Sequence, residues 1–194
     1  MNTELARRVS CEAFEARYTQ CDDPWQFAAS PYERNRYASI MQALSRTYYD
    51  VAYEPGSSIG VLTLQLASLA KRVIATDIAP SAVKQTKARC NALSNVEVLC
   101  EDVAIYLPIV PLDLIIFSEI GYYFETGELA RIASSLARKL KTRGEFVACH
   151  WLGNSEDHVL HGDLVHETLK SSLSLLWVKS ERFDCFRIDC WVKP

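Results

Sequence analysis

Apolar runs alternate with helical stripes along most of this chain, which is the pattern of an α/β protein. A strand is predicted from Tyr49, and four further apolar runs predict buried strands at residues 73–77, 95–100, 112–118 and 145–150. The run 112–118 is almost uninterrupted, as is typical of a central parallel strand covered on both faces. Two β-rich runs, 174–183 and 186–192, follow without an intervening helix and predict a hairpin.

The segments between the strands have helical spacing. Leu62, Leu66 and Leu69 share one helical face, and Pro80 begins a helix that is expected to run to Leu93. A further helix has an apolar stripe, with Thr126 predicted as its cap and Gly144 as its end. The last helix is predicted over residues 163–173, capped by Asp163.

The first 46 residues are predicted to form a helical appendage ahead of the sheet. Residues 32–44 have helical spacing, and prolines at 24 and 31 interrupt the segment. Trp25 and Tyr32 lie near these breaks, where aromatic side chains on a movable segment suit a lid over a ligand. The alternative is that both rings simply pack on the core.

Composition narrows the class of protein. The length of 194 residues predicts a single domain, residues 1–194, with a substantial core. A net charge of −3 gives no electrostatic reason to expect nucleic acid or an anionic membrane as partner. No apolar run is long enough to span a bilayer, and residues 1–10 lack the core of a signal peptide. Seven scattered cysteines without a C-x-x-C pair argue against a disulfide framework or a zinc site, so we expect a reduced, cytoplasmic protein.

A small-residue loop follows the first strand and carries the main functional signal. It contains Glu54, Gly56, Ser58 and Gly60, and the second strand ends in Asp77. A loop of this kind lets the backbone approach a nucleoside, while an acid that closes the next strand binds the ribose hydroxyls. The sequence of the loop does not match the dinucleotide-binding pattern G-x-G-x-x-G, which weighs against an NAD oxidoreductase. The alternative is an ordinary strand-to-helix turn.

Other candidate side chains follow the remaining strands. Asp102 comes after the third strand, where it can accept the exocyclic amine of an adenine; Glu101 beside it is expected to be solvated. Glu119 and His150 end the fourth and fifth strands, so both are expected at the edge of the sheet where ligands bind. The spacing of the histidines does not match H-E-x-x-H, and no metal is expected.

The order E-x-G-x-S-x-G resembles the first motif of class I S-adenosylmethionine-dependent methyltransferases, with Ser58 at the middle glycine. Segments 23–25, 30–33, 54–60, 118–123, 150–151 and 162–166 look like the nodulation-factor N-methyltransferase (NodS-like) family, and the resemblance covers nearly the whole chain. It implies a Rossmann-like class I methyltransferase fold: a mostly parallel seven-stranded sheet, helices on both faces and a C-terminal antiparallel hairpin.

The resemblance also implies S-adenosyl-L-methionine as cofactor, S-adenosyl-L-homocysteine as product, and an amine of a small molecule or oligosaccharide as acceptor. Cofactor contacts are expected from Glu54, Gly56, Ser58, Gly60, Asp77, Ile78, Asp102, Val103, Ser118, Trp25 and Arg34. Acceptor contacts are expected from Tyr32, Tyr122, Tyr123, Trp151 and His166.

An amine must lose a proton before methylation, and we expect Glu119 or His150 to take it. For His150 the alternative is a histidine whose hydrogen bonds are satisfied within the protein. The Asn-Pro-Pro-Tyr type of motif is absent after the fourth strand, which disfavours DNA adenine and protein glutamine as acceptors. An oxygen acceptor and a non-catalytic methyltransferase-like protein stay as alternatives, and the sequence leaves the oligomeric state open.

Overall fold

The structure is a computed structural model that describes residues 9–194. The first eight residues of the expected appendage, and most of the segment judged to lack a signal-peptide core, lie outside the described residues. The elements follow in the order α1 (Cys11–Gln20), α2 (Pro31–Ala43), β1 (Tyr49–Pro55), α3 (Val61–Leu66), β2 (Ala70–Asp77), α4 (Pro80–Arg89), β3 (Val96–Cys100), β4 (Leu112–Ser118), the 3-10 turn η1 (Gly121–Tyr123), α5 (Thr126–Lys139), β5 (Leu140–Trp151), α6 (Gly162–Ser172), β6 (Leu176–Arg182) and β7 (Phe186–Val192).

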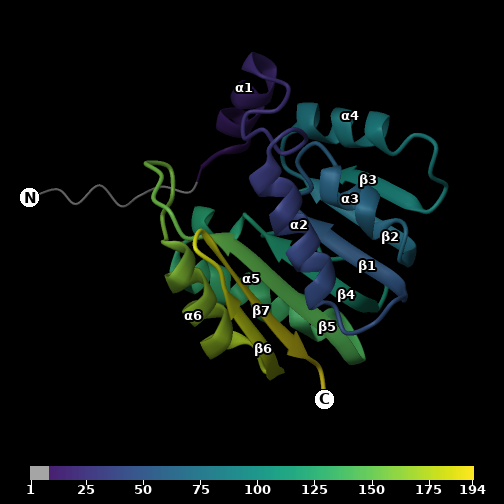
Figure 1. Cartoon of the computed structure of the whole chain (residues 1–194), viewed down its shortest axis with the longest axis vertical. Coiled ribbons are helices and arrows are strands. Elements are labelled where there is room, and N and C mark those ends of the chain that lie inside the picture. The colour runs from purple at the N-terminus through teal and green to yellow at the C-terminus, as the bar shows by residue number, and fades with distance from the viewer. Residues whose placement is uncertain (1–8) are drawn as a thin grey trace, which may run out of the picture.

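The seven strands form one sheet in the order β3-β2-β1-β4-β5-β7-β6 (Figure 1). Strands β1 to β5 pair in parallel, while β7 runs antiparallel to both β5 and β6. The predicted sheet and the C-terminal hairpin are therefore confirmed. The strand order reverses direction between β1 and β4, which is where open α/β sheets bind their ligands.

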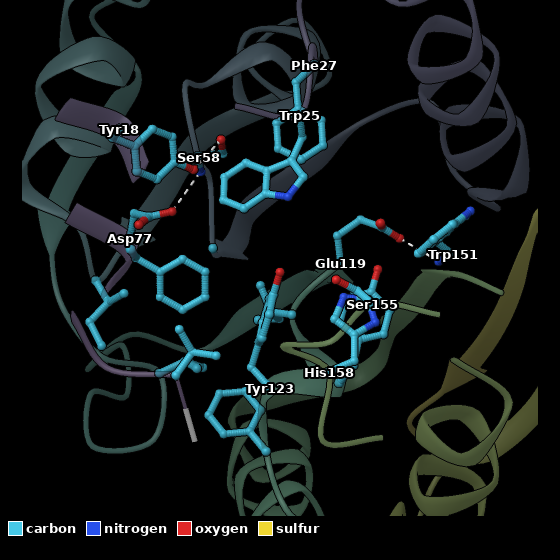
Figure 2. A pocket seen from close by; sticks show the side chains of 18 of the residues that line it. Tyr18, Trp25, Phe27, Ser58, Asp77, Glu119, Tyr123, Trp151, Ser155 and His158 are labelled. Carbon is cyan, nitrogen blue, oxygen red and sulfur yellow. Dashed lines mark hydrogen bonds between the residues drawn. The ribbon is translucent and has the colours of Figure 1, made fainter. Parts of the chain in front are cut away.

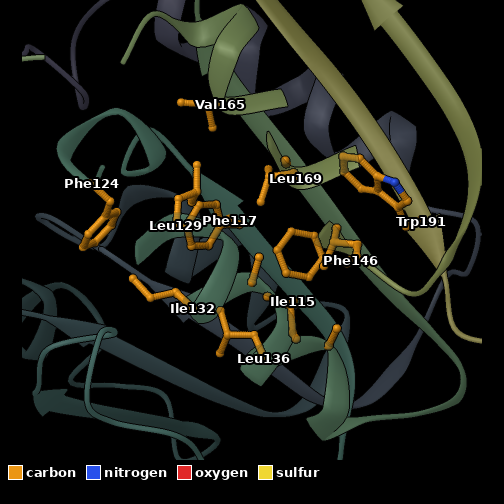
Figure 3. Packing of buried hydrophobic residues seen from close by; sticks show 14 of the residues in the cluster. Ile115, Phe117, Phe124, Leu129, Ile132, Leu136, Phe146, Val165, Leu169 and Trp191 are labelled. Carbon is orange, nitrogen blue, oxygen red and sulfur yellow. The ribbon is translucent and has the colours of Figure 1, made fainter. Parts of the chain in front are cut away.

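Helices cover both faces of the sheet because each has an apolar side. Helices α5 and α6 pack on one face, and their Leu129, Leu136 and Leu169 contact Phe117 and Phe146 of the sheet (Figure 3). Helices α2 and α3 cover the other face through residues such as Ile40 and Leu66. Strand β4 is buried at every position, as the uninterrupted apolar run predicts.

Several predicted helix boundaries are wrong, each for a local reason. Glu125, not Thr126, is the N-cap of α5, because Glu125 has the extended backbone and Thr126 is already helical. Gly144 does not end that helix but lies within β5, which begins at Leu140. The cap of α6 is His161, whose Nδ1 accepts the N–H of Asp163, so Asp163 is in the first turn.

Two other helices are shorter than predicted. Helix α4 ends at Arg89 rather than near Leu93, and α3 ends at Leu66, so Leu69 falls in the turn before β2. None of the described helices is long and apolar enough to cross a membrane. That the whole chain is a single domain stays a prediction.

Candidate functional site

A cavity of about 410 Å³ lies at the carboxyl ends of the parallel strands. At one end of it are the loop after β1 and the last residue of β2, represented by Ser58 and Asp77 (Figure 2). At the other end are Glu119, Trp151 and His158, which follow β4 and β5 (Figure 2). Cavities of this size bind small molecules and cofactors.

The loop after β1 has a conformation that few sequences allow. Gly56, Ser58 and Gly60 all have positive φ, at 72°, 50° and 79°. The strained Ser58 is held from several sides: its N–H donates to Asp77 Oδ2 at 2.8 Å, and its Oγ accepts the hydroxyl of Tyr18 at 2.6 Å. A serine is strained at positive φ, and the hydrogen bonds to Tyr18 and Asp77 offset that strain.

Asp77 lines the cavity and is nearly covered. Its two oxygens accept the N–H groups of Ser58 and Ala79, at 2.8 and 2.9 Å. Burial nevertheless raises the pKa of Asp77 to about 6, because desolvation outweighs those hydrogen bonds. Asp102 lines the same cavity after β3, and its Oδ1 accepts the N–H of Ala104. The two carboxylates thus follow neighbouring strands, as the hydrogen-bonding edge of a nucleoside requires.

Glu119 faces the other end of the cavity in a strained conformation, with φ of 60°. Its Oε1 accepts the N–H of Trp151 at 2.7 Å and lies 3.4 Å from Nη1 of Arg36. Arg36 is only 1% exposed; it also pairs with Glu33 and donates to Ser118 Oγ at 2.9 Å. The guanidinium therefore joins α2 to the ends of β4 and β5 from behind the cavity wall.

Aromatic rings form the walls between these two ends. Trp25 and Phe27, from the segment between α1 and α2, stack with centroids 5.6 Å apart. Tyr122, Tyr123 and Trp151 line the opposite side. Trp25 and Tyr32 are half-buried rings that line the cavity and also pack against neighbouring aromatic side chains. That they belong to a movable lid stays a prediction.

Most of the expected site residues come together at this cavity. Those that line it are Trp25, Tyr32, Gly56, Ser58, Asp77, Ile78, Asp102, Val103, Glu119, Tyr122, Tyr123 and Trp151. Six others do not line it: Arg34, Glu54, Gly60, Ser118, His150 and His166.

Each of the four expected cofactor contacts away from the cavity has another partner. Arg34 is exposed and donates to the carbonyl of Ala29. Glu54 is buried behind the loop, where it accepts the hydroxyl of Thr63 at 2.5 Å. Gly60 is the N-cap of α3. Ser118 accepts from the buried Arg36 and faces the protein rather than the cavity.

His150 and His166 lie in a buried hydrogen-bonded chain beneath the site. The N–H of Gly121 donates to Nε2 of His150 at 3.0 Å, so a neutral His150 carries its proton on Nδ1. That nitrogen is 3.3 Å from Nε2 of His166, whose Nδ1 is 2.8 Å from Oδ2 of Asp189. Desolvation lowers the pKa of His150 well below its ordinary value, which keeps it neutral.

This geometry corrects the expectation that His150 is a base and that His166 contacts the acceptor. Both rings are fully buried, and both nitrogens of each are hydrogen-bonded within the protein. The chain instead fixes the backbone of Gly121, two residues after Glu119.

Several lining residues were not expected from the sequence. They are Val9, Phe14, Tyr18, Phe27, Glu33, Glu101, Ile120, Phe124, Asn154, Ser155 and His158. Glu101 lines the cavity and is exposed, which agrees with the expectation that it is solvated. The aromatic content of α1 and the polar segment after β5 are the only sequence signals that could have indicated them. Among residues 9–194, no three His, Cys, Asp or Glu side chains are arranged to hold a metal ion.

The comparisons with known proteins agree with this geometry. The family model of nodulation protein S (NodS) matches residues 11–179. The chain belongs to the NodS family.

Two curated proteins of the same name are similar to this chain in sequence. Nodulation protein S of Rhizobium tropici is 29% identical over 133 residues, which cover 68% of this chain and 56% of the relative. Nodulation protein S of Bradyrhizobium diazoefficiens is 33% identical over 104 residues, covering 53% and 49% of the two chains. The NodS-family chain thus spans about half the length of the curated relatives it matches.

Among solved structures, the N-methyltransferase NodS of Bradyrhizobium japonicum WM9 in complex with S-adenosyl-L-homocysteine is similar to this chain. The TM-score is 0.84 at 21% identity, with 96% of this chain and 100% of that chain covered. The likeness confirms that the NodS-family chain has the class I methyltransferase fold.

Proposed function

We propose that this NodS-family chain transfers the methyl group of S-adenosyl-L-methionine to an amine of a small molecule or oligosaccharide. The observation that carries the proposal is one cavity with two chemically different ends: Asp77 and Asp102 at one, Glu119 and aromatic rings at the other. The first end suits a nucleoside and the second an acceptor cation. The N-methyltransferase NodS with bound S-adenosyl-L-homocysteine supports this assignment.

The residues present fit the cofactor. The Asp77 carboxylate accepts backbone N–H groups, among them those of Ser58 and Ala79, and its two oxygens have four lone-pair sites, so acceptor capacity is left for a ribose hydroxyl. Asp102 would accept the adenine amine, and Ile78 and Val103, which directly follow Asp77 and Asp102 in the chain, also line the cavity. A Cβ on Gly56 would come within 2.3 Å of Cγ2 of Ile120, so the loop fits closely against the acceptor side.

Four expected cofactor residues would act indirectly. Glu54 and Gly60 would hold the loop, and Ser118 would hold the end of β4 through Arg36. Arg34 would act only through the shape of the segment before α2, since it bonds to the carbonyl of Ala29.

The bound cofactor would supply a methyl group activated on a sulfonium, so no metal is needed for the transfer. The chain's part is to hold the acceptor in line and to exclude water. The Glu119 carboxylate would attract an ammonium group, and the faces of Tyr122 and Trp151 would favour the same charge. Trp25 and Phe27 would cover the bound ligands from the N-terminal segment.

An amine of an oligosaccharide is the acceptor class that the resemblance to nodulation-factor N-methyltransferases implies, and the N-methyltransferase NodS supports an amine. An oxygen acceptor is the alternative. A cytoplasmic location also stays a proposal, supported by seven cysteines that all have free thiols.

Isothermal titration with S-adenosylmethionine and S-adenosylhomocysteine tests the cofactor. We expect micromolar binding by the wild type and none by Asp77→Ala. Asp50→Ala is the matched control. Asp50 is an exposed acid near the start of β1, at the edge of the sheet opposite to the one where Asp77 ends β2. Absence of binding to either nucleoside would remove the proposal. Binding without turnover of any amine or alcohol would favour a non-catalytic protein.

A further inference from the structure

His158 differs from the other three histidines of the chain in how its ring is used. Both ring nitrogens of His150 and of His166 are hydrogen-bonded, as described above. His161 is also fully engaged, since its Nε2 bonds to the carbonyl of Leu152 at 2.7 Å and its Nδ1 accepts the N–H of Asp163. Among the described residues, none bonds to a ring nitrogen of His158, and its Nδ1 is buried without a partner.

His158 is also the histidine that lines the cavity. It lies on the same side as Glu119 and Ser155 and away from Asp77 (Figure 2). Its location is therefore the acceptor end rather than the nucleoside end. The other ring nitrogen, Nε2, also has no partner among the described residues and is not covered as Nδ1 is, so it is the nitrogen that can bond to a ligand in the cavity.

The protein holds this ring firmly. It stacks on Tyr122 with centroids 4.0 Å apart and an interplanar angle of 7°. The two residues that follow, Val159 and Leu160, donate their N–H groups to the carbonyl of Tyr122 at 2.8 and 3.1 Å. Asp157, the residue before, pairs with Arg17 of α1 at 2.7 Å. These contacts position the ring without using either nitrogen.

Glu119 is the less suitable base of the two groups at this end. Its Oε1 accepts the Trp151 N–H and lies 3.4 Å from Nη1 of Arg36, so this oxygen is already engaged by donors of the protein. The ring nitrogens of His158 have no such partner among the described residues. A neutral imidazole complements the carboxylate, since the ring accepts a proton near neutral pH.

We infer that His158 is the general base that deprotonates the acceptor amine, with Glu119 binding the ammonium beside it. This assignment rests on the proposed methyl transfer. One ring nitrogen of His158 takes a proton from the ammonium, which leaves a neutral amine. The amine lone pair then forms the N–CH₃ bond, while the electron pair of the broken C–S bond stays on sulfur. The total charge is conserved: before the reaction one positive charge is on the ammonium and one on the sulfonium, and afterwards one is on the imidazolium and one on the methylated ammonium.

The electrostatic surroundings agree with a base that is neutral before it acts. Desolvation lowers the pKa of His158 below its ordinary value, so the ring is unprotonated at neutral pH. The groups that face it are Asp157 and Glu119, which raise its pKa, Arg17 and His161, which lower it, and the rings of Tyr122, Tyr123 and Trp151.

The test compares turnover of His158→Gln with the wild type, using S-adenosylmethionine and a glucosamine tetramer as probe. We expect kcat to fall by about 10²- to 10⁴-fold at pH 7, the usual contribution of a general base. The loss should shrink as the pH rises above the pKa of the amine itself, because the acceptor then needs no base. A role in folding alone would give a loss independent of pH. His158→Asn serves as a second variant if the glutamine does not fold.

The affinity for S-adenosylhomocysteine should match the wild type, since His158 lies away from the nucleoside end. His161→Gln is the matched control and should keep wild-type kcat, because His161 does not line the cavity. Turnover of His158→Gln equal to the wild type, or a pH-independent loss, would overturn the base assignment while leaving the methyltransferase proposal intact. Absence of turnover by the wild type on amine probes would overturn both.

Discussion

Replacement of Glu54 by glutamine should stabilise the protein at neutral pH and make its stability less dependent on pH. Glu54 is 4% exposed, and its side chain accepts the hydroxyl of Thr63 at 2.5 Å. Burial raises its pKa from 4.5 to about 8, since desolvation outweighs that hydrogen bond. The folded protein therefore binds a proton on Glu54 at pH 7 that the unfolded chain releases.

The sign and the size follow from this difference. An acid with a raised pKa in the folded state stabilises the fold below the unfolded pKa of 4.5, and that stability is lost as the pH rises toward about 8. A pKa shift of this size corresponds to roughly 3 kcal/mol lost by pH 7 relative to pH 4, and about 2 kcal/mol lost between pH 6 and 8. Glutamine accepts the same Thr63 hydrogen bond and has no charge to desolvate.

Thermal unfolding of both proteins between pH 5 and 8 measures the effect. The melting temperature of the wild type should fall relative to Glu54→Gln by about 4–8 °C between pH 6 and 8, at about 2–4 °C per kcal/mol for a chain of this size. Asp77, whose pKa is raised to about 6 by burial, titrates in both proteins, so most of its own contribution cancels in the difference. Its charge also raises the pKa of Glu54, and that coupling is part of the effect measured. Parallel melting profiles across this range would refute the reasoning, because they would show that Glu54 is ionised in the folded state.

Two further variants test the loop and the buried chain. Gly56→Ala should weaken S-adenosylhomocysteine binding at least tenfold in a titration, because φ is 72° and the new Cβ would come within 2.3 Å of the Ile120 side chain. The control is Gly127→Ala, which has open space at its Cβ and should bind with wild-type affinity. His166→Leu removes a hydrogen-bond partner from both His150 and Asp189 and should lower the free energy of unfolding in urea by about 2–5 kcal/mol. The control His161→Ala removes the N-cap of α6 and should lower it by about 1 kcal/mol. Equal losses in the two variants would contradict a stabilising role for the buried hydrogen-bonded histidines.

The sequence predicts the sheet well because its signals are local. Strand β4 is an apolar run bounded by polar residues, and its predicted bounds, 112–118, match the structure. Asp77 and Asp102 could be predicted for the same reason, since Asp77 is the last residue of β2 and Asp102 lies two residues after β3. Parallel strands bring such residues to one edge whatever the rest of the chain does.

The rest of the site depends on contacts between distant residues. Whether a histidine faces a ligand or the interior cannot be deduced from its place near the end of a strand. His150 is the last residue but one of β5, and its ring turns inward to His166, which lies 16 residues away along the chain. Arg36 belongs to no recognisable sequence motif. Its ion pair with Glu119 forms only because α2 packs beside the end of β4. His158 lies in a polar segment whose path is set by the carbonyl of Tyr122.

Backbone strain marks the same region independently of any motif. Among residues 9–194, four that are not glycine have positive φ: Gln26, Ser58, Glu119 and Arg143. Ser58 and Glu119 line opposite ends of the cavity, and Gln26 lies between Trp25 and Phe27 in its wall. Such strain costs of order 1–3 kcal/mol per residue and persists where the surrounding structure enforces it. The hydrogen bonds from Tyr18 to Ser58 and from Trp151 to Glu119 do so here, which favours a site whose shape is fixed before a ligand binds.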